Sequence, residues 1–302
     1  MTRPCSLGPA ARGAVEFVVR WGLGVLLLVA CSLLPSTLAA QDTLPAYLRD
    51  RGTGVRTSLL GTYVRRGELL IYPFYEYYWD HDAEYKPGEL GYGPDTTDYR
   101  GRYRASEGIL FLGYGIAENV ALEFEAAVIT AEQETSPNDT SSARPDKVKE
   151  SGLGDVEGQI RWRFQRETAS RPELYTFFET VFPLQRDRHV IGTQDWEFAT
   201  GIGFARGYRW GTLTLRASVE YVPAASPKID AGEYAIEWLR RFSRRWRVAA
   251  AIEGVQLDEV SLITEVQYHF GRHAYLKANT SVGLTENATD FAPEIGVMIS
   301  LP

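Results

Sequence analysis

The sequence predicts an all-β fold, an antiparallel up-and-down β-barrel of about twelve strands of the transmembrane, outer-membrane type. Segments with alternating polar and apolar side chains recur along the chain. Each is roughly ten residues long, the length that a tilted strand needs to cross a bilayer. The connections between segments alternate between short and long, as the periplasmic turns and outer loops of such barrels do. A soluble β-sandwich also has alternating strands, and it stays open as the alternative fold.

The clearest strand runs from residue 151 to residue 165, SGLGDVEGQIRWRFQ. Successive side chains of a strand point to opposite faces, so this strand has a charged face and an apolar face. The charged face holds Asp155, Glu157, Gln159, Arg161 and Arg163, and the apolar face holds Val156, Gly158, Ile160, Trp162 and Phe164. A slip of one residue would turn two arginines toward lipid, at about 2 to 4 kcal/mol each near the midplane. We therefore expect a fixed register.

Eleven more segments repeat this pattern in chain order. They are Glu68–Asp80, 99–116, 120–132, Leu174–Leu184, Trp196–Tyr208, Thr212–Tyr221, Glu233–Phe242, Trp246–Glu253, Ser261–Phe270, Ala274–Gly283 and Phe291–Leu301. In segment 99–116 we assign Arg102 and Arg104 to the polar face. This assignment leaves Glu107 on the apolar face, and a β-bulge near Glu107 would restore the phase.

The connections follow from these segments. We expect tight turns at 117–119, 209–211, 243–245 and 271–273, a longer turn at 166–173, and long outer loops at 80–98, 133–151, 185–195 and 222–232. With this orientation, aromatic residues fall at the strand ends, where interfacial belts form. The periplasmic belt would hold Trp162, Phe164, Trp210, Trp238, Phe242, Trp246, Tyr268 and Phe270, and the outer belt Trp79, Trp196, Tyr221 and Phe291.

Composition excludes two classes of protein. The formal net charge of −7 disfavours a nucleic-acid partner, because phosphate binding needs a basic surface. The mean hydropathy of −0.23 is too polar for a helical membrane protein. After the N-terminus no apolar run approaches the roughly 20 residues of a membrane helix. A barrel meets both observations, because half of each strand faces a polar lumen.

Residues 1–40 are predicted to be a signal peptide, with a basic leader, an apolar core from Trp21 to Leu34 and a small-residue cleavage region. A second possibility is a lipoprotein signal in which Cys31 is lipidated. Both cysteines, Cys5 and Cys31, lie in this leader. We therefore expect neither a disulfide nor a metal-thiolate site in the exported chain.

Residues 41–66 do not alternate and precede the barrel domain of residues 67–302. Leu59, Leu60, Tyr63 and Val64 have helical spacing, which predicts one helical turn. The segment is either a periplasmic tail or a plug that enters the barrel, and the sequence leaves both open.

The predicted lumen is charged. The candidate lumen-lining residues are Glu76, Arg102, Arg104, Glu123, Glu125, Asp155, Glu157, Arg161, Arg163, Glu179, Arg216, Glu220, Glu237, Arg247, Glu265, Lys277 and Glu294. An acidic excess in a wet pore favours the passage of cations or neutral solutes. Alternatively, the charges pair across neighbouring strands and fill the barrel in place of an apolar core.

The first outer loop is acidic, with Asp80, Asp82 and Glu84 close together. These residues have the opening spacing of a calcium loop, but Tyr85 stands where such a loop needs glycine. His81 and His189 lie near outer-loop carboxylates, in the region where a barrel hydrolase would place catalytic groups. No serine elbow or metal-ligand spacing accompanies them. We therefore expect no enzymatic activity and no cofactor.

One strand supports a family resemblance. Gly152-Leu153-Gly154-Asp155, leading to Arg161-Trp162-Arg163-Phe164, resembles a strand of outer-membrane proteins of the MetA-pathway of phenol degradation family. Residues 292–296, APEIG, resemble the last strand of that family. The resemblance implies a β-barrel channel or transporter for small, often aromatic, compounds.

These observations favour an outer-membrane channel that passes small solutes, aromatic or cationic, through a charged lumen. The first alternative is a closed barrel that binds or supports other surface components through its acidic outer loops, and the second is a loop-sited hydrolase. The expected partners are outer-membrane lipids, small solutes and the barrel-assembly machinery, and the oligomeric state stays open.

Overall fold

A computed structural model describes residues 44–302, except residues 89, 141, 194, 224–226, 257 and 272. The predicted signal peptide, Cys5 and Cys31 lie outside the described residues. Within them the one helical element is the short 3-10 helix η1 (Ala46–Leu48). No helix of this described part is long and apolar enough to cross a membrane.

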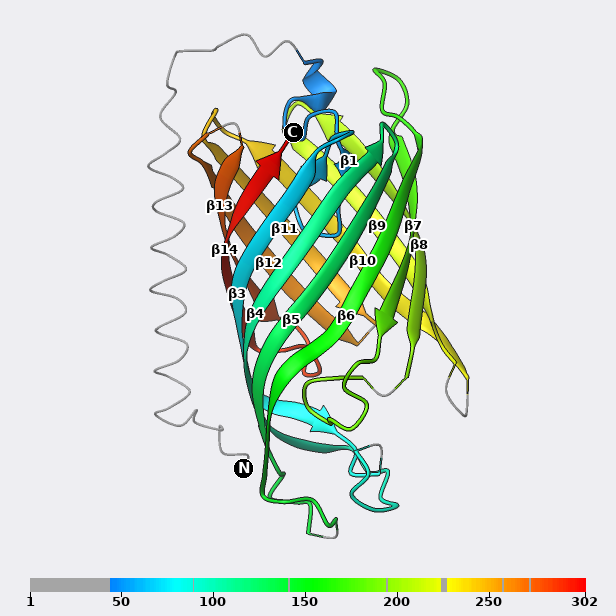
Figure 1. The fold of residues 1–302 in the computed structure, drawn as a ribbon, viewed down its shortest axis with the longest axis vertical. Helices are drawn as coiled ribbons and strands as arrows, with labels where there is room; N and C mark the ends of the chain where they lie inside the picture. Colours follow the sequence, from blue (N-terminus) through cyan, green and yellow to red (C-terminus); the bar gives the residue numbers. More distant parts are fainter. Residues whose placement is uncertain are drawn as a thin grey trace, which may run out of the picture. The chain divides into compact units, whose positions relative to one another are not determined.

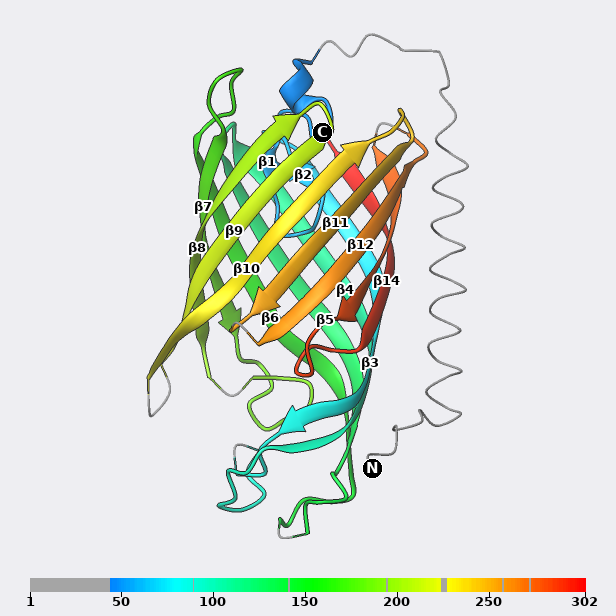
Figure 2. The same cartoon turned by 180° about the vertical axis from the view of Figure 1, so that it is seen from behind.

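Twelve antiparallel strands close into a barrel, which confirms the predicted fold (Figures 1 and 2). The strands are β3 (Leu69–Tyr85), β4 (Tyr99–Ala117), β5 (Val120–Glu134), β6 (Lys147–Gln165), β7 (Glu173–Phe182), β8 (Glu197–Tyr208), β9 (Gly211–Val222), β10 (Lys228–Arg241), β11 (Trp246–Val255), β12 (Glu259–His269), β13 (Ala274–Gly283) and β14 (Phe291–Leu301). Each strand pairs with its neighbours in sequence, and β14 pairs with β3 to close the wall. All twelve predicted segments are strands.

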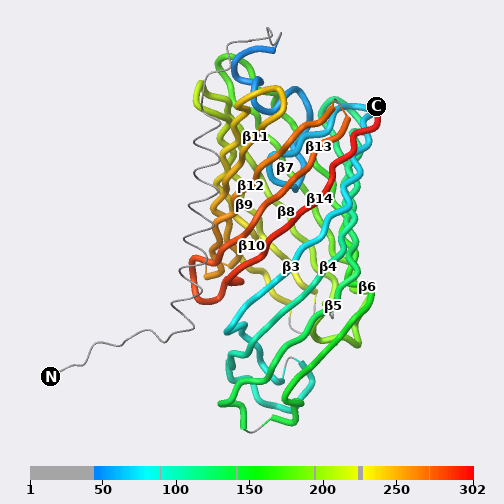
Figure 3. Tube along the Cα trace, turned by 90° about the vertical axis from the view of Figure 1, so that its left-hand side faces the viewer, coloured from blue at the N-terminus to red at the C-terminus, as the bar shows by residue number. Residues whose placement is uncertain are grey.

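Strands β3 to β6 are the longest, with 15 to 19 residues, and they extend beyond the rest of the wall at the long-loop end (Figure 3). Residues assigned to long outer loops still pair here, for example Tyr85 with Tyr99 and Glu134 with Lys147. The predicted loops at 80–98 and 133–151 are therefore too long. The hydrophobic alternation stops where lipid stops, whereas backbone pairing continues into water.

The predicted bulge near Glu107 is wrong. Glu107 pairs with Glu76 and with Ile129 in an unbroken register, and it shares the inner face with the buried Phe111. Arg102 and Arg104 consequently point outward, so their assignment to the lumen is also wrong. The inner face of β4 is apolar toward the short-turn end. The sequence of a strand with apolar residues on both faces does not show which face meets lipid.

The outer face of the wall is apolar over most of its height. Leu110, Leu122, Phe124, Ile160 and Trp162 are each 41–51% exposed there. Aromatic side chains gather near the strand ends, with Trp162, Phe164, Trp210, Phe242, Trp246 and Phe270 exposed at the short-turn end, and Trp196, Tyr221 and Phe291 at the long-loop end. This is the pattern of a lipid-facing band between two interfaces.

Residues 44–66 form η1 and a hairpin of β1 (Val55–Arg56) and β2 (Tyr63–Val64). Both views show this segment at the end of the barrel where the C-terminus lies (Figures 1 and 2). The predicted helical turn is wrong, because Tyr63 and Val64 are in a strand. The hairpin turns at Gly61, whose φ of +63° suits glycine.

Candidate functional site

The hairpin lies in the lumen near the short-turn end, and its two faces meet different parts of the wall. Val55 pairs with Val64, so both side chains share one face. That face packs into a buried apolar cluster with Leu70, Tyr72, Phe74, Ile109, Phe111, Ala121 and Met298 of strands β3, β4, β5 and β14. Burial of this apolar surface holds the hairpin against one side of the barrel.

The opposite face of the hairpin is charged and faces the wall from β6 to β10. Arg51 Nη2 donates to Glu167 Oε2 at 2.8 Å, and its Nη1 donates to Glu173 Oε2 at 2.9 Å. Arg56 forms a hydrogen-bonded ion pair with Glu237. These side chains are buried, so each charge needs the partner that it has.

Electrostatics at the hairpin follow from this burial. Burial lowers the pKa of Arg56, but the attraction of Glu237 outweighs it and raises the pKa above the ordinary value. Burial raises the pKa of Tyr63 to about 12, although the nearby Arg51 and Arg56 oppose the shift. Both arginines therefore stay charged and Tyr63 stays neutral across the physiological range.

The hairpin tip, Ser58 to Gly61, is hydrogen-bonded to polar and charged side chains of the wall. The Ser58 backbone N–H donates to Glu123 Oε2 at 2.7 Å. Gln267 donates to the Gly61 carbonyl at 3.3 Å, and Lys277 donates to the Leu60 carbonyl at 3.4 Å. The tip thus fixes side chains from three separate strands.

Two wall glycines let the N-terminal segment approach closely. A Cβ at Gly207 of β8 would collide with the backbone of Tyr47, and a Cβ at Gly115 of β4 would collide with the backbone of Arg65. The Gly115 N–H also donates to the Glu68 carbonyl at 3.0 Å. A side chain at either position would push the segment away from the wall.

Next to the hairpin tip, on its long-loop side, lies a cavity of about 240 Å³ with Ser58, Leu59 and Leu60 on one side. Its walls carry the carboxylates of Glu76, Glu123, Glu125, Glu157, Glu179, Glu233, Glu253 and Glu294, together with Arg216 and Lys277. Arg216 is paired with Glu233, Glu237 and Glu253, and Lys277 with Glu265 at 3.0 Å. The cavity therefore has an acidic excess.

Several of these carboxylates face each other across neighbouring strands. Glu125 lies directly opposite Glu157, and Glu76 lies between Glu294 and Glu107. Among the described residues, none of these five has an arginine or lysine within 4.0 Å. Like charges directly opposite each other are unfavourable in a sheet, and no basic side chain of the described residues lies close enough to these five glutamates to offset the repulsion.

We call these five glutamates the acidic band. Of the predicted lumen residues, fifteen do lie on the inner faces of their strands: Glu76, Glu123, Glu125, Asp155, Glu157, Arg161, Arg163, Glu179, Arg216, Glu220, Glu237, Arg247, Glu265, Lys277 and Glu294. Their role in solute passage stays a prediction. Sequence analysis missed Arg51 and Arg56, which lie in a segment without strand alternation, and Glu107, whose face was assigned wrongly.

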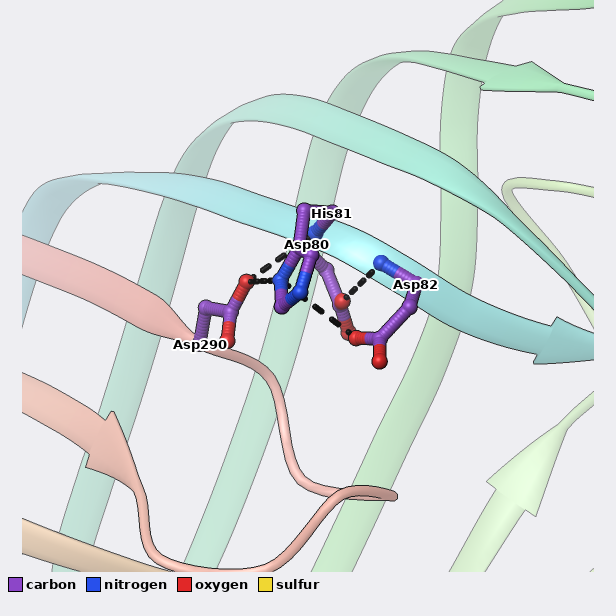
Figure 4. A group of neighbouring side chains, drawn as sticks. All are labelled: Asp80, His81, Asp82 and Asp290. Carbon is purple, nitrogen blue, oxygen red and sulfur yellow. Dashed lines mark hydrogen bonds and ion pairs between the residues drawn. The ribbon is translucent and has the colours of Figure 1, made fainter. Parts of the chain in front are cut away.

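At the long-loop rim, Asp80, His81, Asp82 and Asp290 form a cluster (Figure 4). Their potential ligand atoms lie within 4.8 Å of one another, and no other such group occurs in the described part of the chain. The imidazole of His81 is hydrogen-bonded to Asp290, and its Nδ1 lies 3.4 Å from Asp82 Oδ1. The set could accept a divalent cation, and here it links β3 to the start of β14. The third acidic residue of this loop, Glu84, lies 3.6 Å from Arg100 instead.

The closed antiparallel wall, its apolar outer band and its polar interior define an outer-membrane β-barrel. No protein-family model matches the chain, and no curated protein matches it. Solved structures share the fold. An outer membrane channel from Pseudomonas putida F1 has a TM-score of 0.58 at 12% identity, over 78% of this chain and 96% of that chain.

Two further structures are more distant. The translocator domain of the autotransporter NalP from Neisseria meningitidis has a TM-score of 0.46 at 11% identity, over 76% of this chain and 88% of its own. The toluene transporter TbuX from Ralstonia pickettii has a TM-score of 0.37 at 10% identity, over 78% and 88%. At 12% identity, the likeness to the outer membrane channel is one of fold.

Proposed function

We propose that this protein is an outer-membrane channel for small cationic solutes whose lumen the N-terminal hairpin closes on the periplasmic side. The observation that carries the proposal is the acidic band on the long-loop side of the hairpin tip. A row of facing carboxylates inside a membrane-spanning wall is unfavourable unless cations occupy the space between them or some of the carboxyl groups are protonated. Repulsion among the glutamates therefore favours the entry of positively charged solutes.

Two further features support a channel. The chain shares its fold with a solved outer membrane channel over most of both chains. The cavity beside the tip also includes the half-buried Leu59 and Ile263, which give apolar surface next to the carboxylates. A solute with a positive charge and a small apolar part would meet both kinds of surface, and ions of the same charge would follow the same path.

The structure gives less support to a loop-sited hydrolase. His81 and Asp290 are within hydrogen-bond reach. In the described part of the chain, however, the hydrogen-bond and ion-pair partners of His81 are all carboxylates. A histidine that activates a nucleophile needs a hydroxyl or thiol beside it. A closed barrel acting through its outer loops remains the second hypothesis, because its acidic rim and the filled lumen both suit it.

Single-channel recording in a planar bilayer with a salt gradient tests the proposal. We expect cation-selective current, and we expect Glu125→Gln/Glu157→Gln to move the reversal potential toward the unselective value. Glu132→Gln/Glu134→Gln is the matched control. Both of these side chains lie on the outer face of β5, the strand that has Glu125 on its inner face. Insertion without current in the wild type and in a hairpin-deleted variant would contradict the channel proposal and favour the closed barrel.

A further inference from the structure

The outer face of β4, β5 and β6 is organised in horizontal rows of three residues. From the short-turn end toward the long-loop end, apolar rows come first, for example Tyr114, Leu122 and Ile160. The last of them contains Gly108, Val128 and Leu153. A hydroxyl row of Ser106, Thr130 and Ser151 follows. The change from apolar to hydroxyl side chains marks the edge of the hydrocarbon on this part of the wall.

Two charged rows follow the hydroxyl row on its long-loop side. The first contains Arg104, Glu132 and Lys149 in register. The second contains Arg102, Glu134 and Lys147, linked by the ion pairs of Glu134 with both neighbours. Each row has the order basic, acidic, basic, so four cations stand against two carboxylates. Trp79, an aromatic residue of the outer belt, is in register with Arg104.

This surface is open to its surroundings. The side chains of Arg102 and Lys147 are 55% and 48% exposed. They project sideways from the extended part of the wall, because they share the strand face that meets lipid nearer the short-turn end. Exposed ion pairs of this kind contribute little to stability, so the arginines and lysines are able to exchange a carboxylate partner for another anion.

We propose that Arg102, Arg104, Lys147 and Lys149, the outer basic patch, bind the phosphorylated headgroup of an outer-leaflet lipid. Four cations at the height where headgroups begin form an electrostatic complement to clustered phosphates. Arginine also makes two-pronged hydrogen bonds to phosphate oxygens. Glu132 and Glu134 of β5 lie between the arginines of β4 and the lysines of β6. The proposal does not depend on whether the lumen conducts.

Lipid binding by the purified full barrel tests the proposal. The barrel in detergent is titrated with a diphosphorylated lipid A and with the same lipid after removal of its phosphates, and bound lipid is counted by native mass spectrometry. We expect Arg102→Gln/Arg104→Gln/Lys147→Gln/Lys149→Gln to weaken binding of the phosphorylated lipid at least about tenfold. Binding of the dephosphorylated lipid should not change.

The matched control removes the same charge at the opposite end of the barrel, with Arg166→Gln/Arg209→Gln/Arg244→Gln/Arg245→Gln. This variant should bind the phosphorylated lipid within about twofold of the wild type. Equal losses in the two variants, or a loss that does not depend on the lipid phosphates, would overturn the proposal.

A second variant keeps the test decisive if the fourfold change prevents folding. Glu132→Gln/Glu134→Gln removes the competing carboxylates and leaves the four cations in place. We expect it to bind the phosphorylated lipid more tightly than the wild type, with a steeper dependence on salt. Unchanged or weaker binding by this variant would also overturn the proposal.

Discussion

Both halves of the lumen contain inward glutamates, but the glutamates have different neighbours in the two halves. Near the short-turn end, each buried arginine of the hairpin faces a glutamate of the wall, as Arg56 faces Glu237. In the outer half, Glu125 faces Glu157 and Glu76 faces Glu294. The partners of the glutamates near the short-turn end come partly from the N-terminal hairpin, which is not part of the barrel wall. The difference teaches that the hairpin fills the lumen near the short-turn end and adds its arginines to the wall cations that neutralise the glutamates there.

Removal of the hairpin is the strongest way to break this contrast. Deletion of residues 50–64 should raise single-channel conductance on the order of tenfold, because a barrel of this size has room for water once nothing fills it. It should also increase cation selectivity, since Glu237 and Glu173 lose Arg56 and Arg51. An unchanged conductance in a correctly folded variant would mean that the hairpin does not obstruct the lumen.

A single charge change should loosen the hairpin without removing it. Arg56→Gln leaves Glu237 buried with Arg216 as its remaining cation, at 3.4 Å. We expect the docked hairpin to lose roughly 3 kcal/mol, measured by hydrogen exchange of the amides of residues 55–64. Arg65→Gln is the control, because the Arg65 side chain is 60% exposed and its pair with Glu68 contributes at most about 1 kcal/mol.

A side chain in the wall should displace the segment from the other direction. Gly115→Val places a side chain against the Arg65 backbone, so faster exchange or proteolysis is expected between residues 44 and 66. Gly108→Val is the matched control on the same strand, since a Cβ there meets nothing within 4 Å. Equal protection in the two variants would show that the close approach at Gly115 does not hold the segment.

The smallest effect concerns the rim, where opposite charges again meet. His81 lies beyond the charged row that contains Arg104, outside the membrane-spanning wall. The hydrogen bond to Asp290 outweighs partial burial and raises the pKa of His81. The link between β3 and β14 is therefore fully present below the ordinary histidine pKa of about 6.5 and is lost as the pH rises through the raised value.

Hydrogen exchange of residues 284–290, compared between the wild type and His81→Gln at each pH, measures this link. The wild type should be better protected at pH 5, and the difference should vanish at high pH. A difference that persists at pH 9 would mean that protonation of His81 does not hold the rim together.

The sequence alone determined the barrel wall. Lipid outside and polar side chains inside impose a period of two on every strand, and this local signal located all twelve strands from Glu68 to Leu301. It also placed fifteen inward charges correctly, because in most strands one face is clearly apolar. The two faces of segment 99–116 were assigned the wrong way round. Phe111 faces a buried cluster inside the barrel, and Arg102 and Arg104 lie on the outer face, past the edge of the lipid on the long-loop side.

Only the tertiary structure decided what fills the lumen. Arg51 and Arg56 meet carboxylates 116 to 181 residues away, and no periodicity in residues 41–66 indicates those partners. The same holds for the acidic band, because the opposition of Glu125 and Glu157 depends on strand register and on the bulge between them and Val128. Local sequence patterns report which medium a side chain faces, whereas pairing across the lumen depends on the closed geometry of the barrel.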